Sequence, residues 1–319
     1  MKGLVSKVII VLIGLIIVDF VVQFACNKML DILDGESESR IGSQAIENYC
    51  LNAVHCDLLI VGSSPANCGF DTKLISDSIS KYDPNGHIWK VANASRSQSE
   101  IPWKYCVIMS AIDRNPPRAI LLDINTRYSL NKDKSTGIVS VMRSYYYRNK
   151  YVKEVLDEYD EPREKFLYKL SGLYRFRSSL FALPLQFTKP FGGDGYMPYY
   201  ANIDSSEVRN LNAKDSSDVD TSALKYLIRI INKCKTNNIK LVITLAPKLI
   251  ITKKNCDSYR TLVRICKENN IELIDMGDDI RFNNYRLHYD KGHINAKGAE
   301  LYSSIISQRL RDIIFDVNQ

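Results

Sequence analysis

The stretch Cys56-Asp-Leu-Leu-Ile-Val-Gly-Ser-Ser64 decides the fold of this 319-residue chain. Its apolar residues follow one another without alternating with polar ones, which is typical of a parallel strand buried on both faces of a sheet. The small residues at its end, Gly62-Ser63-Ser64, predict a tight turn, and after Pro65 the segment 72–80 can form a helix. Ligands of open α/β sheets bind outside the carboxyl ends of the strands, so the turn places a hydroxyl group where a ligand would bind.

Ser64 is therefore a candidate nucleophile. Backbone N–H groups at the start of the following helix could stabilise a negatively charged oxygen beside it. The alternative is an ordinary turn, because Gly-Ser-Ser often follows a strand without any chemistry. The choice depends on which other reactive side chains the fold brings to the same edge of the sheet.

The rest of the chain supplies four more apolar segments that predict buried strands, with helical segments between them. The five predicted strands are 57–62, 90–94, 119–124, 239–245 and 271–275. The predicted helices include 101–113, an amphipathic segment with Leu224, Leu227, Ile228 and Ile231, the segment 259–267, and a last helix capped by Asn295. Two of these helices are predicted to end at Asn-Asn pairs, at 237–238 and 269–270. This alternation predicts a doubly wound, flavodoxin-like parallel sheet in three α/β/α layers.

The segment 126–219 breaks the alternation. It is rich in charged residues and holds eleven of the nineteen tyrosines, with helical parts at 148–159 and 163–174. One interpretation is a helical cap whose aromatic side chains pack on one another. The other is a lid or a platform for carbohydrate, because aromatic rings present flat apolar faces.

The N-terminus predicts a membrane anchor. Residues 8–25 are apolar except for Asp19 and Gln23, a length near the lower limit for a membrane-spanning helix. No small-residue cleavage site follows, so we expect an uncleaved single-pass anchor in the cell membrane. Lys2 and Lys7 favour a cytoplasmic N-terminus, which places the rest of the chain on the outer side. Asp19 is costly in lipid and is expected to face a partner helix or the membrane interface.

We therefore expect an anchor at 1–30, a juxtamembrane linker at 31–55, and an α/β domain at 56–319 that carries a helical insertion at 126–219. The composition, 45% hydrophobic and 25% charged, excludes disordered and fibrous classes. The net charge of +7 comes from scattered Lys and Arg, without a nucleic-acid-binding motif. The eight cysteines lack the spacing of a zinc site, and their pairing is left open.

A second reactive stretch, Asp290-Lys-Gly-His293-Ile-Asn-Ala-Lys-Gly298, precedes the last predicted helix and leaves the sheet at the same edge as Ser64. An acid three residues before a histidine can accept a hydrogen bond from one ring nitrogen, and the other nitrogen can then take a proton from a serine. His288 is a competing base, but the spacing to Asp290 favours His293. Taken alone, the stretch also fits a helix N-cap beside a loop histidine.

Two more polar side chains follow strands at this edge. Asn125 comes directly after the third strand, so its amide could donate to an oxyanion. Lys248 follows the fourth strand and could bind an anionic group of a substrate, although a solvated lysine is the simpler interpretation. Reactive side chains in this order, at the ends of two strands and before the last helix, favour chemistry over chance.

Over residues 55–125 and 221–315 the chain resembles the SGNH/GDSL hydrolase superfamily, in particular membrane-anchored bacterial members linked to cell-surface polysaccharide acylation. The matching blocks are Gly62-Ser63-Ser64 with Asn67-Cys-Gly-Phe-Asp71, and Asp290-Lys-Gly-His293 with Asn295 and Gly298. The resemblance implies a catalytic triad of Ser64, His293 and Asp290. It also implies an oxyanion hole of Ser64, Ser95 and Asn125. The middle blocks depart from the family: Ser95 replaces a glycine, and Asp123-Ile-Asn125 keeps only the asparagine.

The expected function is that of a serine esterase or O-acyltransferase, acting on acetyl groups of an envelope or extracellular glycan. Water or a sugar hydroxyl could accept the acyl group, and the sequence does not distinguish them. The expected partners are an acyl-ester donor, a glycan acceptor or substrate, the membrane around the N-terminal helix and, for transfer, an acyl-donor membrane protein. No cofactor, metal or nucleic acid is expected. The alternative is an envelope protein that uses the same fold without catalysis, as a glycan-binding or assembly scaffold.

Overall fold

The structure is a computed structural model that describes residues 2–35, 55–125, 129–130, 139–181, 183–184, 194–208, 219–249 and 256–315. Contacts divide the chain into two compact units. One, the helical unit, comprises Met1–Tyr49 and Val139–Gly192, and the other, the sheet unit, comprises Cys50–Ile138 and Gly193–Gln319. Most of the predicted linker lies outside the described residues, and the predicted domain boundaries remain a prediction.

The sheet unit contains five parallel strands in the order β2-β1-β3-β4-β5. Their bounds are Leu58–Val61 for β1, Val91–Asn93 for β2, Ala119–Asp123 for β3, Lys240–Leu245 for β4 and Glu272–Asp275 for β5. Every residue of β1, β2 and β3 is buried, as the continuous apolar runs predict. The strand order reverses at β1, because the chain crosses first to β2 and then back to β3. This arrangement confirms the predicted flavodoxin-like sheet.

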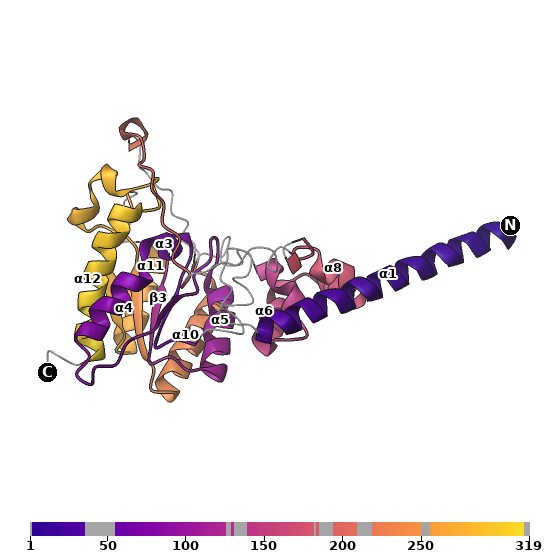
Figure 1. Cartoon of the computed structure of the whole chain (residues 1–319), viewed down its shortest axis with the longest axis horizontal. Coiled ribbons are helices and arrows are strands. Elements are labelled where there is room, and N and C mark those ends of the chain that lie inside the picture. Colours follow the sequence, from indigo (N-terminus) through magenta and orange to yellow (C-terminus); the bar gives the residue numbers. More distant parts are fainter. Residues whose placement is uncertain are drawn as a thin grey trace. The chain divides into compact units, whose positions relative to one another are not determined.

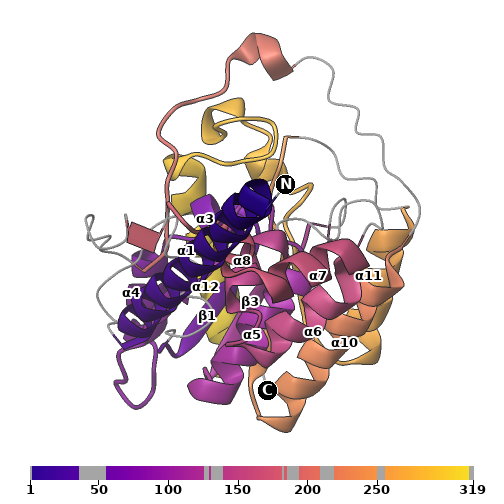
Figure 2. The same cartoon turned by 90° about the vertical axis from the view of Figure 1, so that its right-hand side faces the viewer.

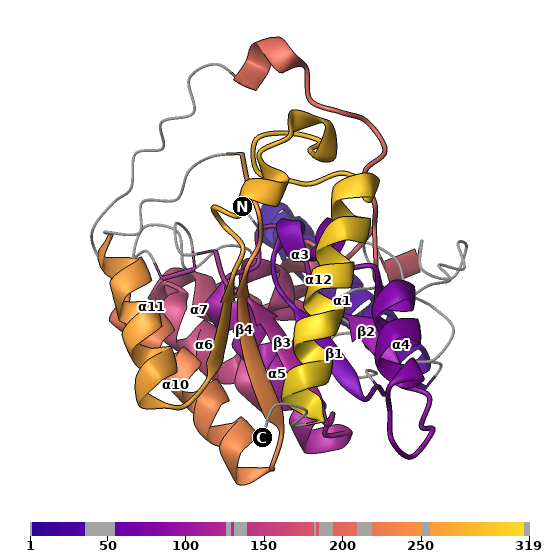
Figure 3. The same cartoon turned by 90° about the vertical axis from the view of Figure 1, so that its left-hand side faces the viewer.

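Helices cover both faces of this sheet (Figures 1 and 3). The short helix α3 (Ser64–Gly69) and the longer α4 (Thr72–Lys81) and α12 (Ala296–Ile314) pack together on one face. On the other face α5 (Ile101–Arg114) packs against α10 (Thr221–Thr236), and α11 (Asp257–Glu268) contacts β5. The described part of this unit also contains short 3₁₀ helices at Ser205–Val208, Ile280–Phe282 and Tyr285–Leu287.

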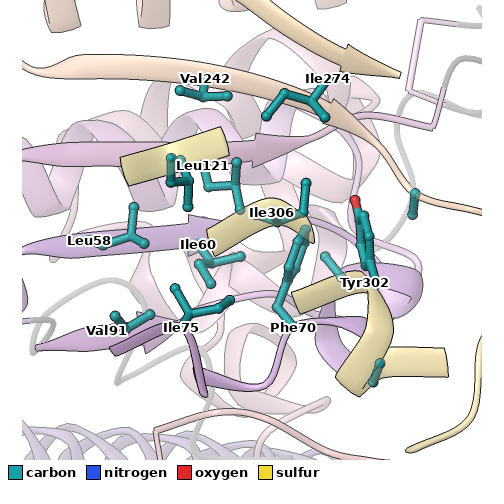
Figure 4. Close-up of a cluster of buried hydrophobic side chains, with 14 of the residues drawn as sticks. Leu58, Ile60, Phe70, Ile75, Val91, Leu121, Val242, Ile274, Tyr302 and Ile306 are labelled. Carbon is teal, nitrogen blue, oxygen red and sulfur yellow. The ribbon is translucent and has the colours of Figure 1, made fainter. Parts of the chain in front are cut away.

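The core beneath α4 and α12 combines side chains from all five strands with those of three helices (Figure 4). Phe70 follows α3 and its ring lies 4.8 Å from the ring of Tyr302 of α12, centroid to centroid. Both side chains are fully buried, together with Ile306. Because α12 supplies so much of this core, it shares one hydrophobic cluster with β1, although most of the chain separates the two in sequence.

The predicted helix ends are confirmed by their capping residues. Asn295 caps α12, since its side-chain oxygen accepts a hydrogen bond from the Gly298 N–H at 3.1 Å. Asn237 is the C-cap of α10, and Asn238 after it adopts a φ of 54°, in the left-handed region that asparagine tolerates. Asn270 does the same after α11, also with a φ of 54°.

The helical unit contains α1 (Lys2–Gly35), a 3₁₀ helix at Val139–Tyr145, α6 (Lys150–Tyr159), α7 (Pro162–Leu170) and α8 (Gly172–Phe176). Helix α8 packs alongside α1 (Figure 2). By length and composition α1 can cross a membrane, although a signal sequence passes the same test. It extends well beyond the predicted apolar segment 8–25 at both ends.

Candidate active site

The turn after β1 brings Ser64 to the carboxyl edge of the sheet. Gly62 is required there, because a Cβ atom at this position would lie 2.4 Å from the Cβ of Ala66 and 2.8 Å from that of Asp123. Ser63 is extended and serves as the N-cap, so Ser64 is the first residue of α3. The sequence predicted a helix only from residue 72 and therefore missed α3, in which Pro65 occupies the first turn. Ser64 thus places both its hydroxyl group and its N–H at a helix N-terminus.

Ser64, His293 and Asp290 form a continuous hydrogen-bonded chain. The Ser64 hydroxyl donates to His293 Nε2, and the two atoms are 2.7 Å apart. His293 Nδ1 lies 2.8 Å from Asp290 Oδ1 and 2.9 Å from Oδ2. A carboxylate only accepts, so Nδ1 carries the proton in this arrangement and Nε2 is the acceptor for the serine. The structure thus brings all three predicted triad residues together in the predicted order.

The loop before α12 fixes the acid in this chain. Asp290 Oδ1 accepts the N–H of Gly292 at 2.7 Å and the N–H of His293 at 2.9 Å. Burial raises the pKa of Asp290, but the hydrogen bonds from the His293 side chain and these N–H groups outweigh it and hold the pKa below its ordinary value of 3.8. Asp290 is therefore an anion at neutral pH, as an acid that orients an imidazole must be.

His288, the competing histidine, has a structural role. Its side chain is fully buried, and its Nε2 lies 2.8 Å from the carbonyl oxygen of Phe282. Burial lowers the pKa of His288 below 6.5, with smaller opposing contributions from its hydrogen bonds and from Asp290. It is kept neutral inside the loop and does not contact Ser64 in the described structure.

Asn125 follows β3, the neighbour of β1, and is held from two sides. Lys248, in the loop after β4, donates from Nζ to Asn125 Oδ1 at 2.9 Å. The Asn125 N–H donates to Ser129 Oγ at 3.2 Å, and the Ser129 N–H donates to the Asn125 carbonyl at 2.7 Å. Because the ammonium group engages the oxygen of the amide, Nδ2 is the end that is directed away from Lys248. The sequence favoured a solvated Lys248, with an anionic substrate group as the alternative partner, and did not predict this contact.

A buried charged cluster lies behind Asn125. Lys104 of α5 is fully buried, and its Nζ donates to the Asp123 carbonyl at 3.0 Å and to Ser129 Oγ at 3.2 Å. Glu100 accepts a short hydrogen bond from Ser129 and lies 3.9 Å from the Lys104 ammonium. Burial raises the pKa of Glu100 above 4.5, against the opposing effect of Lys104. The cluster fixes the backbone of the segment that carries Asn125.

Ser95, the third residue of the predicted oxyanion hole, already has an acceptor for its N–H. That N–H donates to Asn93 Oδ1 at 3.1 Å, within the turn after β2. The Ser95 carbonyl in turn accepts from Asn67 Nδ2 at 3.3 Å, which ties the turn to α3. An oxyanion would have to displace Asn93 to use this donor, so the Ser95 N–H is not directly available in the described structure.

The segment 194–203, called here the strap, crosses the same edge of the sheet and was not predicted as part of the site. Backbone hydrogen bonds fix it: Asn93 N–H to Asp194 O at 2.7 Å, Met197 N–H to Asn67 O at 3.0 Å, Ala296 N–H to Tyr199 O at 2.7 Å and Ile203 N–H to His288 O at 2.9 Å. The strap places the ring of Tyr199 5.9 Å from the imidazole of His293, edge to face, and stacks it on Tyr289 at 4.3 Å. The glycine at position 195 is the sequence signal that could have marked a turn here, because it adopts a φ of 92°, a conformation that glycine adopts readily.

No family model matches the sequence, and no curated protein matches it. Solved structures with a similar fold include a psychrotrophic esterase from a Pseudoalteromonas species, at 11% identity and a TM-score of 0.41 over 80% of this chain and 97% of that one. An acetylxylan esterase from Geobacillus stearothermophilus matches at 15% identity and a TM-score of 0.36, over 81% of this chain and 93% of that one. A putative lipolytic protein of the G-D-S-L family from Desulfitobacterium hafniense matches at 11% identity and a TM-score of 0.37, over 79% of this chain and 97% of that one. Two of these structures are described as esterases, and the third is described as a putative lipolytic protein of the G-D-S-L family.

Proposed function

We propose that this chain is a serine esterase or O-acyltransferase of the SGNH/GDSL type. The observation that carries the proposal is the unbroken hydrogen-bonded chain from the Ser64 hydroxyl through the His293 ring to the Asp290 carboxylate. A helix N-terminus at Ser64 and the amide of Asn125 lie on the loops after neighbouring strands, at the point where the strand order reverses. That is where open α/β sheets bind their ligands.

In the proposed reaction, His293 Nε2 removes the proton of Ser64 as the serine oxygen attacks the carbonyl carbon of an ester. Asp290 stabilises the imidazolium that forms. The tetrahedral oxyanion accepts hydrogen bonds from the Ser64 N–H and from Asn125 Nδ2. Collapse expels the alcohol, which takes the proton from His293, and leaves an acyl group on Ser64. Water or a sugar hydroxyl then attacks the acyl group and gives its proton to His293. The bond to the Ser64 oxygen breaks, and this oxygen takes the proton back from His293.

The substrate part of the proposal is an acetyl ester of an envelope or extracellular glycan. It rests on the resemblance to membrane-anchored SGNH members and on α1, a helix long and apolar enough to hold the chain at a membrane. The two acceptors differ in one readout: hydrolysis releases free acetate, whereas transfer moves the acetyl group to an added glycan.

The first test is labelling of the full chain by a fluorophosphonate, which reacts with an activated serine hydroxyl. We expect labelling that Ser64→Ala and His293→Ala abolish, and that Ser63→Ala, the neighbouring hydroxyl, leaves in place. Absence of labelling in the wild-type chain, together with no turnover of small acetyl esters, would favour the scaffold.

One observation supports that scaffold alternative. The Ser95 N–H, which the family resemblance assigns to the oxyanion, is engaged by Asn93 in the described structure. A site with two donors instead of three would stabilise an oxyanion less, so a slow enzyme or a glycan-binding protein would both fit this feature. Binding of a glycan by a Ser64→Ala chain, without turnover by the wild type, would identify the scaffold.

A further inference from the structure

Helix α1 has two halves that differ in exposure. From Gly3 to Val18 every side chain is exposed all round the helix. From Asp19 onward one stripe is covered, comprising Asp19, Val22, Gln23, Cys26, Asn27, Met29 and Leu30. These positions recur every three or four residues and therefore form one helical face. The boundary falls at Asp19, one of the two polar residues in the apolar segment 8–25.

Helix α8 covers the start of that stripe and is held there by the carboxylate of Asp19. The N–H of Gly172 donates to Oδ2 at 3.0 Å, and the N–H of Leu173 donates to Oδ1 at 2.8 Å. The hydroxyl of Ser171 also donates to Oδ1. A Cβ atom on Gly172 would lie 2.4 Å from the Cβ of Gln23, so the two helices are in close contact. Asp19 thus caps the N-terminus of a helix from its own chain.

The bare half of α1 is too short to cross a bilayer by itself. Residues 3–18 would span roughly 24 Å at 1.5 Å per residue, whereas the hydrocarbon core is about 30 Å thick. The lipid must therefore reach past Asp19, along the uncovered face where Phe20, Val21 and Phe24 are 66%, 57% and 57% exposed. Because α8 is bound to α1 at Asp19, it would lie at the depth where the lipid ends.

Helices α7 and α8 carry apolar side chains suited to that depth. Phe166 and Leu170 are one turn apart on α7 and are 63% and 70% exposed, and Leu173 of α8 is 41% exposed. Arg163 of α7 is exposed, and a basic side chain at that depth can extend toward phosphate groups. The neighbouring basic residues have partners inside the protein: Arg175 is buried, and Lys165 and Lys169 bind Asp157. Phe181, just after α8, is 82% exposed.

We propose that α7 and α8 lie in the interfacial zone of the membrane that α1 crosses, with Phe166, Leu170, Leu173 and Phe181 in contact with lipid. Three donors from the chain itself satisfy Asp19, so its charge needs no second protein in the membrane. The partner of this surface is the phospholipid bilayer. The proposal does not depend on the proposed enzymatic function.

A photoreactive amino acid, p-benzoylphenylalanine, tests the proposal in the full chain reconstituted into vesicles of phosphatidylethanolamine and phosphatidylglycerol that contain an alkyne-tagged phospholipid. The test positions are Phe166 and Leu173. Ile13 in the bare half of α1 is the positive control, and Ile88 and Ile280, which are 77% and 80% exposed in the sheet unit, are the negative controls. We expect lipid adducts at Phe166, Leu173 and Ile13, and background at Ile88 and Ile280.

Background labelling at Phe166 and Leu173 with strong labelling at Ile13 would overturn the proposal, and so would failure of Ile13 to label, since α1 would then not lie in lipid. Asp19→Leu provides a second measurement. It removes the cap on α8 and should reduce the adduct at Leu173 while leaving the adduct at Ile13 unchanged. Asp19→Asn keeps an acceptor oxygen and should preserve more of the Leu173 adduct than Asp19→Leu. Equal adducts at Leu173 in all three chains would show that Asp19 does not hold α8 at the membrane.

Discussion

If Asn125 donates to the oxyanion, then Lys248 should support catalysis through Asn125. The contact to test is the 2.9 Å hydrogen bond from Lys248 Nζ to Asn125 Oδ1. Without it the amide loses the donor that holds its oxygen toward Lys248, so the orientation that directs Nδ2 away from Lys248 would be less strongly favoured. Lys248→Met removes the donor and the charge but keeps a chain of similar length. Lys248→Arg keeps a hydrogen-bond donor and the positive charge.

The structure sets the size of the two effects. Loss of one oxyanion donor typically costs about 3–4 kcal/mol, so Asn125→Ala should lower kcat by about 10²- to 10³-fold. A hydrogen bond to a charged group contributes about 1.5–3 kcal/mol. Because Lys248 is only half-buried, solvent screening favours the lower end, and Lys248→Met should lower kcat by about 10-fold. Lys248→Arg should recover most of that loss.

The assay is steady-state hydrolysis of a small acetyl ester by the full chain, with the double variant Asn125→Ala/Lys248→Met completing the cycle. If Lys248 acts through Asn125, it has no further effect once the amide is gone, and the double variant should match Asn125→Ala. The same 10-fold loss in both backgrounds would refute the reasoning and assign Lys248 a direct role. Lys73, whose side chain is 84% exposed, provides a matched Lys→Met control.

Three more outcomes are expected. Ser64→Ala and His293→Ala should each remove nearly all esterase activity and should not add in the double variant, because the two residues act as one proton-transfer unit; additive losses in kcat would argue against that unit. His288 is buried, and burial lowers its pKa below 6.5. As the pH falls below 6.5, the unfolded state therefore binds more protons than the folded state. The contribution of a neutral His288 to stability is complete above pH 6.5 and decreases as the pH drops. Thermal unfolding between about pH 7.5 and 5.5 should therefore show a smaller decline in Tm for His288→Gln than for the wild type, and identical slopes would contradict this account. Gly195→Ala should destabilise the chain by more than the roughly 1–2 kcal/mol of a left-handed alanine, because its Cβ would lie 1.9 Å from the Asn93 carbonyl. Gly86→Ala, with a φ of 68° and open space around it, is the control, and equal losses of Tm would mean that the strap does not pack as described.

The sequence predicted the sheet and the approach of Ser64, His293 and Asp290 because both depend on local patterns. Continuous apolar runs such as 119–124 can be buried only between two helical layers, and the structure contains a strand in each predicted segment. Asp290 and His293 are three residues apart, so the turn that joins them is already present in the sequence. Their approach to Ser64 then follows from the topology, since both loops leave the same edge of the sheet.

The features that were missed depend on side-chain direction or on contacts between distant segments. The use of the Ser95 N–H by Asn93 depends on one rotamer, and no sequence pattern predicts it. The contact between Lys248 and Asn125 joins two loops 123 residues apart. The strap is held by hydrogen bonds such as Asn93 N–H to Asp194 O, which link irregular backbone with no periodicity of its own.

The position of the triad along the chain has a consequence for biosynthesis. Ser64 and His293 are 229 residues apart, and α12, which packs on α3 and α4, follows His293 directly. A growing chain therefore carries its serine long before its base, and the core beneath α4 stays incomplete until the last helix is made. Under the proposed function, the Ser64 hydroxyl would be activated only after the loop that carries His293 has reached the edge of the sheet. A ribosome-bound chain that lacks residues 293–319 should therefore react with no fluorophosphonate, whereas the 319-residue chain should react.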